Sequence, residues 1–236
     1  MTEEYQINDP ALGPITIRRS PRLKHYKLIV KQGRIRANLP ATGSEKELLQ
    51  FIEVNRQKLL SAIQRSPAPA IWDERTQLSC TTFRMRICRH QQPHFQLSLR
   101  EGELLISCPW ETRFEEEQTQ QYLRQLLKAA LRHEAKRCLP NRLAALARQH
   151  GFHYNGVTIK DTSSRWGSCS SRRHINLSLL LMTVPWHLID YVLLHELCHT
   201  VELNHSDRFW ALMNRVTDGK ALQLRQELKG RNALIN

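Results

Sequence analysis

The chain has 236 residues and a formal net charge of +13, from 35 Lys and Arg against 22 Asp and Glu. That length allows one large domain or two small ones. It contains no run of about 18 apolar residues, and its acidic first residues lack the apolar centre of a signal peptide, so we expect no membrane span and no secretion. Six scattered cysteines without a C-x-x-C pair are typical of reduced thiols and predict a cytoplasmic protein.

The first half of the chain contains a similar segment twice. Residues 25–40 and 94–109 both alternate apolar and polar residues around a Gly turn and end in Pro, which predicts two β-hairpins. Each hairpin follows a strand-like stretch and precedes a helix-like one. The strand-like stretches are 15–19 and 83–88, and the helix-like ones are 44–63 and 115–138. Either an internal duplication or two ordinary hairpins with a common pattern would explain the similarity.

Basic residues are concentrated in the first of these hairpins. Eight Lys or Arg and no acidic residue lie between Gly13 and Pro40, and Lys27 and Lys31 alternate with apolar neighbours, which places their charges on the outward face. The second copy also has basic residues along a strand-like stretch, Arg84, Arg86 and Arg89. We expect this basic N-terminal face either to bind nucleic acid without sequence specificity or to keep a sheet edge solvated and unpaired.

A helical stretch and two strand-like stretches come next. We expect the helix that begins near residue 115 to break at Pro140 and then to continue to His150, before Gly151. Residues 157–161 and 173–182 alternate like strands. Together with two later helices, these segments predict a compact α+β unit with a short sheet.

The most informative helix carries the sequence His-Glu-Leu-Cys-His. Residues 183–186 supply an N-cap and a proline in the first turn, and an apolar stripe follows. His195 and His199 are four residues apart, so they project from one face of a helix, about 40° apart. Both imidazoles can therefore reach one metal ion. Glu196 lies beside that ion, where it can take a proton from a bound water.

His205 is expected to supply the third ligand. It lies on a predicted loop between this helix and the next, which begins at Ser206 or Asp207. Three nitrogen ligands and an open fourth position are typical of a catalytic zinc site rather than a structural one. The alternative is an exposed helix that carries two histidines by chance. We expect Cys198, between the two ligand positions, to be a packing residue and not a fourth ligand.

The expected chemistry follows from these residues. Zinc bound by neutral imidazoles lowers the pKa of its water from about 15.7 to about 7, and Glu196 would accept the proton and pass it to the leaving amine. Arg165 is a candidate for oxyanion stabilisation or substrate anchoring, with pairing to a surface carboxylate as the alternative. We expect Trp166 to pack in the core, and Glu202 or Asp190 to accept the second N–H of a ligand histidine.

The order of several short motifs resembles that of the YgjP-like metal-dependent hydrolases, which are small zincin-type metallopeptidases, and more distantly that of the SprT-like proteases. The motifs are 165–169 (Arg-Trp-Gly-Ser-Cys), 175–177, Pro185, 189–192, the His-Glu-x-x-His helix, 204–206 and Phe209-Trp210. The resemblance covers residues 113 to 215 well. It implies a minimal zincin fold with one Zn²⁺ per chain, held at His195, His199 and His205, and Glu196 as base. The three histidines are spaced as in the metzincins, but Glu202 stands where those proteins have Gly.

We therefore expect an α+β protein with a strand-rich N-terminal region of two hairpin units, residues 1–112, followed by a zincin-like metallopeptidase domain, residues 113–236. Its expected function is zinc-dependent cleavage of a peptide or protein substrate, which includes proteins bound to nucleic acid. The alternative is a nucleic-acid-binding protein with a structural or degenerate zinc site. Glu196 separates the two, because a structural site has no use for a carboxylate beside its ligands.

Overall fold

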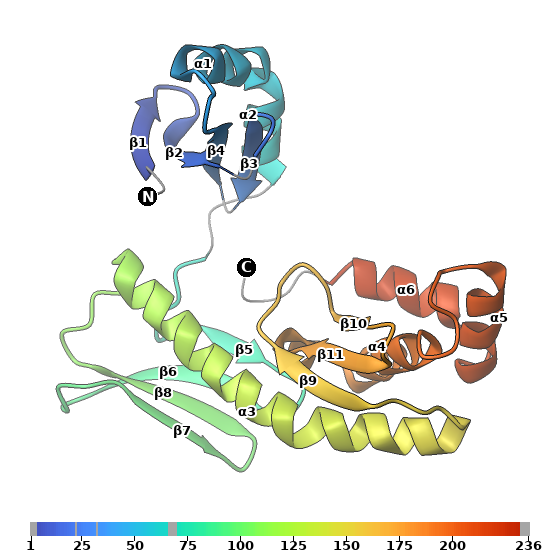
Figure 1. Ribbon diagram of the computed structural model, residues 1–236. Coiled ribbons are helices and arrows are strands. Elements are labelled where there is room, and N and C mark those ends of the chain that lie inside the picture. Colours follow the sequence, from blue (N-terminus) through green and yellow to red (C-terminus); the bar gives the residue numbers. More distant parts are fainter. Residues whose placement is uncertain (1–3, 22, 32, 66–69, 232–236) are drawn as a thin grey trace. The chain divides into compact units, whose positions relative to one another are not determined.

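The computed structural model describes residues 4–21, 23–31, 33–65 and 70–231 (Figure 1). The chain forms two compact units, Met1–Ala70 (unit 1) and Ile71–Asn236 (unit 2), each with its own hydrophobic core. Strands fill most of the first half, and helices are concentrated toward the C-terminus. The α+β class predicted from the sequence is confirmed.

Unit 1 is a four-stranded sheet covered by two helices. The strand order is β1-β2-β4-β3, in which β2 and β4 are parallel and the outer pairs are antiparallel. Ile15, Ile17 and Ile35 point from one face of the sheet into the core, where Leu48 and Ile52 of the first helix join them. The elements are β1 (Glu4–Asp9), β2 (Gly13–Ser20), β3 (Lys27–Lys31), β4 (Arg34–Pro40), α1 (Glu45–Val54) and α2 (Arg56–Arg65).

The first part of unit 2 repeats this sheet. Its order is β5-β6-β8-β7, again with a parallel central pair and antiparallel outer pairs. The elements are β5 (Gln77–Ser79), β6 (Arg84–His90), β7 (Gln96–Arg100) and β8 (Glu103–Pro109). Met85, Ile87, Leu104 and Ile106 form the buried face of this sheet, and the long helix α3 (Glu117–His150) packs against β8.

An arginine clamp is common to the two sheets. In the first, Nη1 of Arg19 donates to the carbonyl oxygens one and three residues after Pro40, at 2.8 and 2.9 Å. In the second, Nη1 of Arg89 donates to the carbonyl oxygens one and three residues after Pro109. Two unrelated hairpins would have no reason to share both the strand order and this clamp. The structure therefore favours internal duplication, which the sequence left open.

The remainder of unit 2 holds a second, smaller sheet and three helices after α3. This sheet has the order β10-β11-β9, with β11 parallel to β9 and antiparallel to β10. The elements are β9 (Gly156–Lys160), β10 (Gly167–Cys169), β11 (His174–Ser178), the 3₁₀ helix η1 (Leu179–Thr183), α4 (Trp186–Cys198), α5 (Asp207–Val216) and α6 (Ala221–Lys229). Helix α4 contacts β10, α3, α5 and α6, so it lies at the centre of this region (Figure 1).

Three predictions of secondary structure are wrong. Pro140 does not break α3, because buried Leu139 and Leu143 on either side hold the helix against the core despite the lost backbone hydrogen bond. The strand predicted over 173–182 ends at Ser178, because the leucine run that follows is buried on all sides as a 3₁₀ turn. The helix predicted over 44–63 is two helices, separated at Asn55.

The division into compact units also differs from the boundary expected between residues 112 and 113. The chain divides after Ala70 instead. The reason lies in α3, whose buried residues Leu123, Leu127 and Leu131 belong to one core cluster with both the second hairpin sheet and the region around α4. The second hairpin unit and the metallopeptidase region therefore share a single core.

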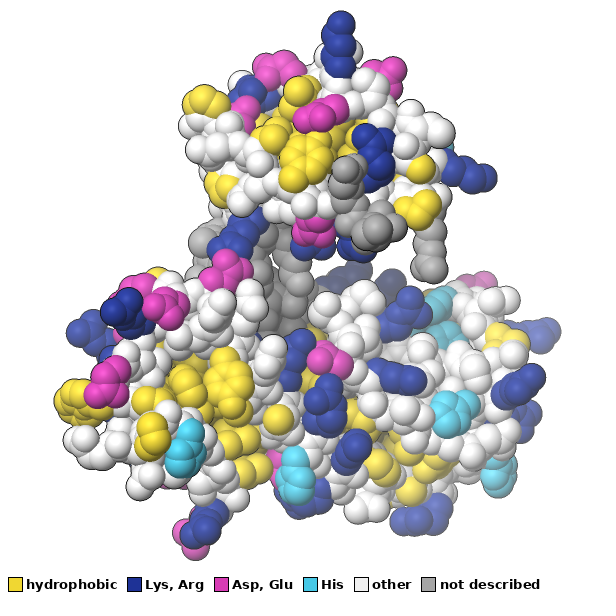
Figure 2. Space-filling model, turned by 60° about the vertical axis from the view of Figure 1, so that its left-hand side comes forward, with side chains coloured by type: hydrophobic (Ala, Val, Ile, Leu, Met, Phe, Trp, Pro, Cys, Tyr) yellow, Lys and Arg dark blue, Asp and Glu magenta, His cyan; other side chains and the backbone are white. Residues whose placement is uncertain are grey.

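Lys and Arg side chains are spread over the face of both units seen in Figure 2. On the first hairpin, Lys27, Arg34 and Arg36 are exposed, while the side chain of Lys31 lies outside the described part. In the second copy Arg89 serves the clamp and is not free on the surface. Nucleic-acid binding at the basic face stays a prediction. Within the described residues, no helix has the length and apolar character needed to cross a bilayer.

Candidate metal centre

Helix α4 positions the first two histidines. Its buried face includes Leu188, Val192 and Leu197, which fix the helix in the core of unit 2. The residue at the N-cap position is Pro185, and no side chain caps this end. Thr183 instead belongs to the preceding 3₁₀ turn and donates to the carbonyl oxygen of Leu180 at 2.7 Å, so the side-chain N-cap expected from the sequence is wrong.

The three predicted histidines converge. The Nε2 atoms of His195 and His199 are 3.2 Å apart, those of His199 and His205 are 3.2 Å apart, and those of His195 and His205 are 3.0 Å apart. The ring of Phe209, a fully buried residue of α5, lies 4.5 to 4.9 Å from each imidazole, centroid to centroid. Phe209 therefore forms a common wall that orients all three rings, a role that its place in an apolar helix stripe did not reveal.

The second nitrogen of His199 has a defined partner. Its Nδ1 lies 3.0 Å from the backbone carbonyl oxygen of Glu202, so Nδ1 carries the proton and Nε2 presents a lone pair to the other two rings. The acceptor is thus the backbone of Glu202 and not its carboxylate. Asp190 does not take this role, because it pairs with Arg142 at 2.7 Å. Nδ1 of His195 is buried without a hydrogen-bond partner among the described residues.

The donor set fits a divalent metal ion. Burial lowers the pKa of His195 to about 3 and also lowers that of His199, so these rings are neutral, as a metal ligand must be. Tetrahedral zinc with Zn–N bonds of about 2.0–2.1 Å would separate its nitrogen ligands by about 3.3 Å, close to the distances found here. Among the described residues, no Cys, Asp or Glu joins the three histidines. Cys198 is buried within the helix, as expected.

Glu196 is buried next to this cluster. Its Oε2 has no hydrogen-bond partner within the described residues, although only 5 % of the residue is exposed. Burial raises the pKa of Glu196 to about 8, and the charge of Arg165 acts in the opposite direction. A buried carboxyl group without a partner is costly. This carboxyl group is therefore available to a water molecule or a substrate in the adjoining cavity.

A cavity of about 300 Å³ opens beside His195 and Glu196. Arg165 lines it and is exposed, and no carboxylate pairs with Arg165 in the described ranges, so the surface ion pair considered as its alternative role is not formed. Trp166 is partly buried, and it both packs against the core and lines the cavity. The predicted core packing of Trp166 is therefore correct, but the sequence did not indicate that Trp166 also lines the cavity.

The sequence did not predict that α6 would line this cavity. Helix α6 contributes Arg225, Leu228 and Lys229. A signal was present, because Ala221, Leu224 and Leu228 have the i, i+3, i+7 spacing of an amphipathic helix. That spacing predicts a packed helix but does not indicate which side chains reach the cavity.

Comparison with known proteins identifies the family. The sequence matches the YgjP-like metallopeptidase domain over residues 24–231. None of the curated proteins compared with the chain matches it. Among solved structures, the metallopeptidase zymogen of Pyrococcus abyssi abylysin is 21% identical, with 39% of this chain and 92% of that chain covered and a TM-score of 0.36. Because the family match spans most of its length, the chain belongs to the YgjP-like metallopeptidases, a family of metal-dependent peptidases.

Proposed function

We propose that the protein is a zinc-dependent peptidase that holds one Zn²⁺ per chain at His195, His199 and His205, with Glu196 as the general base. The convergence of three imidazoles beside a buried, unpartnered carboxyl group carries this proposal. It leaves one side of the centre open to the cavity, where a peptide can enter. Zinc bound there would supply Lewis acidity and acidify the attacking water.

The protein's own residues would handle the protons. Oε2 of Glu196 lacks a partner within the described residues, so it accepts the proton of the attacking water. It then donates that proton to the nitrogen of the leaving amine. Burial raises the pKa of Glu196, whereas Arg165 and a bound divalent cation would both favour the charged carboxylate that takes the proton. Phe209 keeps the three imidazoles in place throughout.

Arg165 is proposed to anchor the substrate or to stabilise the developing oxyanion. Its guanidinium lines the same cavity as Glu196, and its charge already acts on that carboxyl group. A cation on the cavity wall stabilises negative charge that develops on the attacked carbonyl oxygen.

The alternative is a nucleic-acid-binding protein with a structural zinc site. Structural sites hold zinc with four protein ligands, whereas three histidines make up the group found in the described part of the chain. A buried carboxyl group beside the ligands adds cost without benefit in such a site. Both points favour the peptidase.

The test is Glu196→Gln in the full-length, zinc-loaded protein. We expect about one zinc atom per chain by elemental analysis and a loss of casein hydrolysis of about 10²- to 10⁴-fold, the usual contribution of a general base. Glu111→Gln, which makes the same change at an exposed carboxylate that forms no ion pair within the described residues, is the matched control and should keep full activity. If Glu196→Gln keeps both its zinc and its activity, Glu196 is not the base.

A further inference from the structure

The cavity beside the metal centre carries three basic side chains. Arg165 comes from the loop before β10, and Arg225 and Lys229 come from consecutive turns of α6. All three are exposed, and none forms an ion pair with a carboxylate in the described ranges. Among the described residues that line the cavity, Glu196 is the only acidic one. The cavity therefore presents an excess of positive charge next to the site of hydrolysis.

Arg225 has a defined position. Its Cζ lies 5.0 Å from the centroid of the Trp210 ring, a distance typical of a cation–π contact. The Trp210 ring is itself 5.4 Å from Phe209, which contacts the three histidine rings. Arg225 is thus joined through two aromatic rings to the wall that orients the metal ligands. A guanidinium held in this way loses little freedom when it binds a carboxylate.

Tyr191 adds a hydroxyl group to the same cavity. It lies one turn before His195 on α4, with ring centroids 6.1 Å apart, and it lines the cavity. Although only 4 % of the residue is exposed, its hydroxyl group is not among the buried atoms without a partner, and it forms no hydrogen bond within the described residues. The Tyr191 hydroxyl is therefore a donor that a bound group can use.

We propose that this cavity binds a carboxylate of the substrate, with Arg225 as its principal ion pair and Tyr191 as a hydrogen-bond donor. The cavity begins at His195 and Glu196, so the carboxylate would belong to the residue next to the scissile bond. It can be the free C-terminus of a peptide or the side chain of Asp or Glu, which present the same chemistry. This inference rests on the proposed function, because it assigns the bound group to the peptide that is cleaved.

The test uses binding, which does not depend on turnover. Four acetylated tetrapeptides, which differ only at the C-terminal residue after three alanines, are titrated by NMR into full-length, zinc-loaded Glu196→Gln. One ends in Ala carboxylate, one in Ala amide, one in Glu amide and one in Gln amide. We expect either the Ala carboxylate peptide or the Glu amide peptide to bind about tenfold more tightly than its uncharged partner, as one partly exposed carboxylate–Arg pair provides. Whichever pair differs identifies the source of the carboxylate.

Three further variants, each added to Glu196→Gln, locate the residues that recognise the carboxylate. Arg225→Gln should remove the tenfold preference and leave the affinity of the uncharged peptides unchanged. Arg215→Gln removes the same charge from an exposed arginine of α5 outside the cavity, and the preference should persist. Tyr191→Phe should reduce the preference by severalfold without changing the melting temperature of the protein by more than a few degrees.

The proposal is overturned if acidic and uncharged peptides bind equally, if no peptide binds, or if Arg215→Gln reduces the preference as much as Arg225→Gln does. This outcome is separable from the failure of the proposed function. A preference for carboxylates in a wild-type protein that cleaves no peptide would contradict the peptidase and retain the binding site. Cleavage without the preference would do the reverse.

Discussion

Gly167 and Glu196 lie so close together that any side chain at position 167 would have to displace the carboxyl group of Glu196. A Cβ atom on residue 167 would lie 2.6 Å from Oε1 of Glu196 and 2.8 Å from its Cγ. The carboxyl group thus lies against the backbone of β10, at the edge of the small sheet. This contact holds Glu196 from the side opposite its own helix and sets where its free Oε2 points.

Gly167→Ala should displace Glu196 without removing the metal. The new methyl group would push the carboxyl group of Glu196 aside, and a displacement of about 1 Å costs a catalytic group about a hundredfold in rate. We expect casein hydrolysis to fall by about that factor, while elemental analysis still finds about one zinc per chain. Gly230→Ala is the control, because its new Cβ would have its nearest contact at an ordinary 3.5 Å. Equal activity in the two variants would contradict the positioning role of Gly167.

Zinc should stabilise unit 2. In the proposed function the metal binds three preformed imidazoles of the native state and not the unfolded chain, so saturation would add about 3 kcal/mol at a hundredfold excess over Kd, or about 5–10 °C in melting temperature. All five Trp residues lie beyond residue 70, so Trp fluorescence follows the unfolding of unit 2. The protein treated with EDTA should melt lower than the zinc-loaded protein.

The controls for this shift are two histidine variants. His199→Ala should show little difference between the EDTA-treated and zinc-loaded forms, because two ligands bind zinc far more weakly than three. His133→Ala, at an exposed position of α3 outside the cluster, should keep the full shift. A shift of the same size in His199→Ala would mean that zinc binds elsewhere.

The histidine cluster was predictable because its geometry is mostly local. Helix periodicity alone brings His195 and His199 to one face, and the turn after the helix returns His205 to them. The two hairpins were predictable for the same reason, since alternation and a Gly turn define each of them. Local rules failed where long-range packing outweighs them, as at Pro140, which the core holds inside a continuous helix.

The walls of the cavity could not be derived from the sequence. Arg225 and Arg165 are sixty positions apart and meet only because α6 packs across α4, opposite the loop before β10. Gly167 belongs to the Arg-Trp-Gly-Ser-Cys motif that resembles the family, but its closeness to Glu196 depends on the contact between β10 and α4. No periodic pattern encodes contacts of this kind, because each joins elements whose spacing along the chain is arbitrary.

Because each unit has its own arginine clamp, we expect the loss of a clamp to destabilise only the unit that contains it. Arg19→Ala should destabilise unit 1, and Arg89→Ala should destabilise unit 2, each by about 1–3 kcal/mol, because each change leaves backbone carbonyl groups without their donor. In a urea titration, Trp fluorescence follows unit 2, and NMR amide signals from residues 4–65 follow unit 1. Each variant serves as the control for the other. If a clamp variant destabilised the other unit as much as its own, the two units would not have independent cores.

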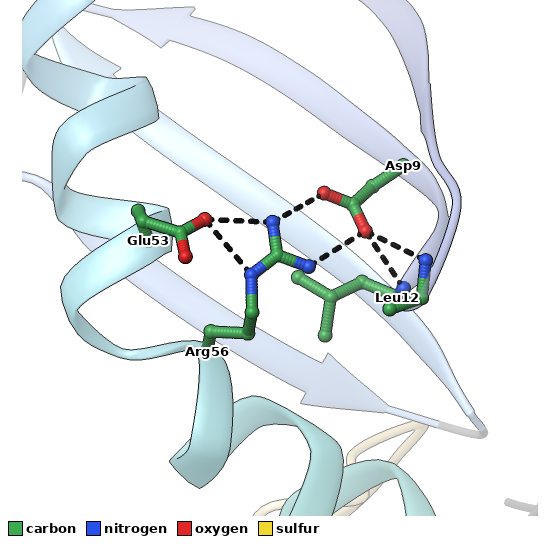
Figure 3. A network of polar contacts seen from close by, with 5 residues as sticks. Asp9, Leu12, Glu53 and Arg56 are labelled. Atoms are coloured by element: carbon green, nitrogen blue, oxygen red, sulfur yellow. Dashed lines mark hydrogen bonds and ion pairs between the residues drawn. The ribbon is translucent and has the colours of Figure 1, made fainter.

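The carboxylate of Asp9 ties the first turn of unit 1 to the start of α2 (Figure 3). It accepts from Arg56 at 2.8 and 2.9 Å and from the backbone N–H groups of Ala11 and Leu12 at 2.9 Å. The hydrogen bonds from Arg56 are the main reason that the pKa of Asp9 lies well below its usual value of 3.8. The folded state therefore stabilises the charged form of the Asp9 carboxyl group more than the unfolded state does.

The sign of the resulting pH dependence follows from that depression of the pKa. The stability that Asp9 contributes is fully present above pH 3.8 and is lost as the pH falls below that value toward the pKa of the folded state. Unit 1 should therefore unfold at a lower urea concentration at pH 3 than at pH 7, as followed by the NMR signals of residues 4–65. Asp9→Asn should lower the midpoint at pH 7 and flatten this dependence. Glu45→Gln removes an exposed carboxylate that forms no ion pair in the described ranges, and it should leave the dependence unchanged. An equally steep loss of stability in Asp9→Asn would assign the acid sensitivity to other groups.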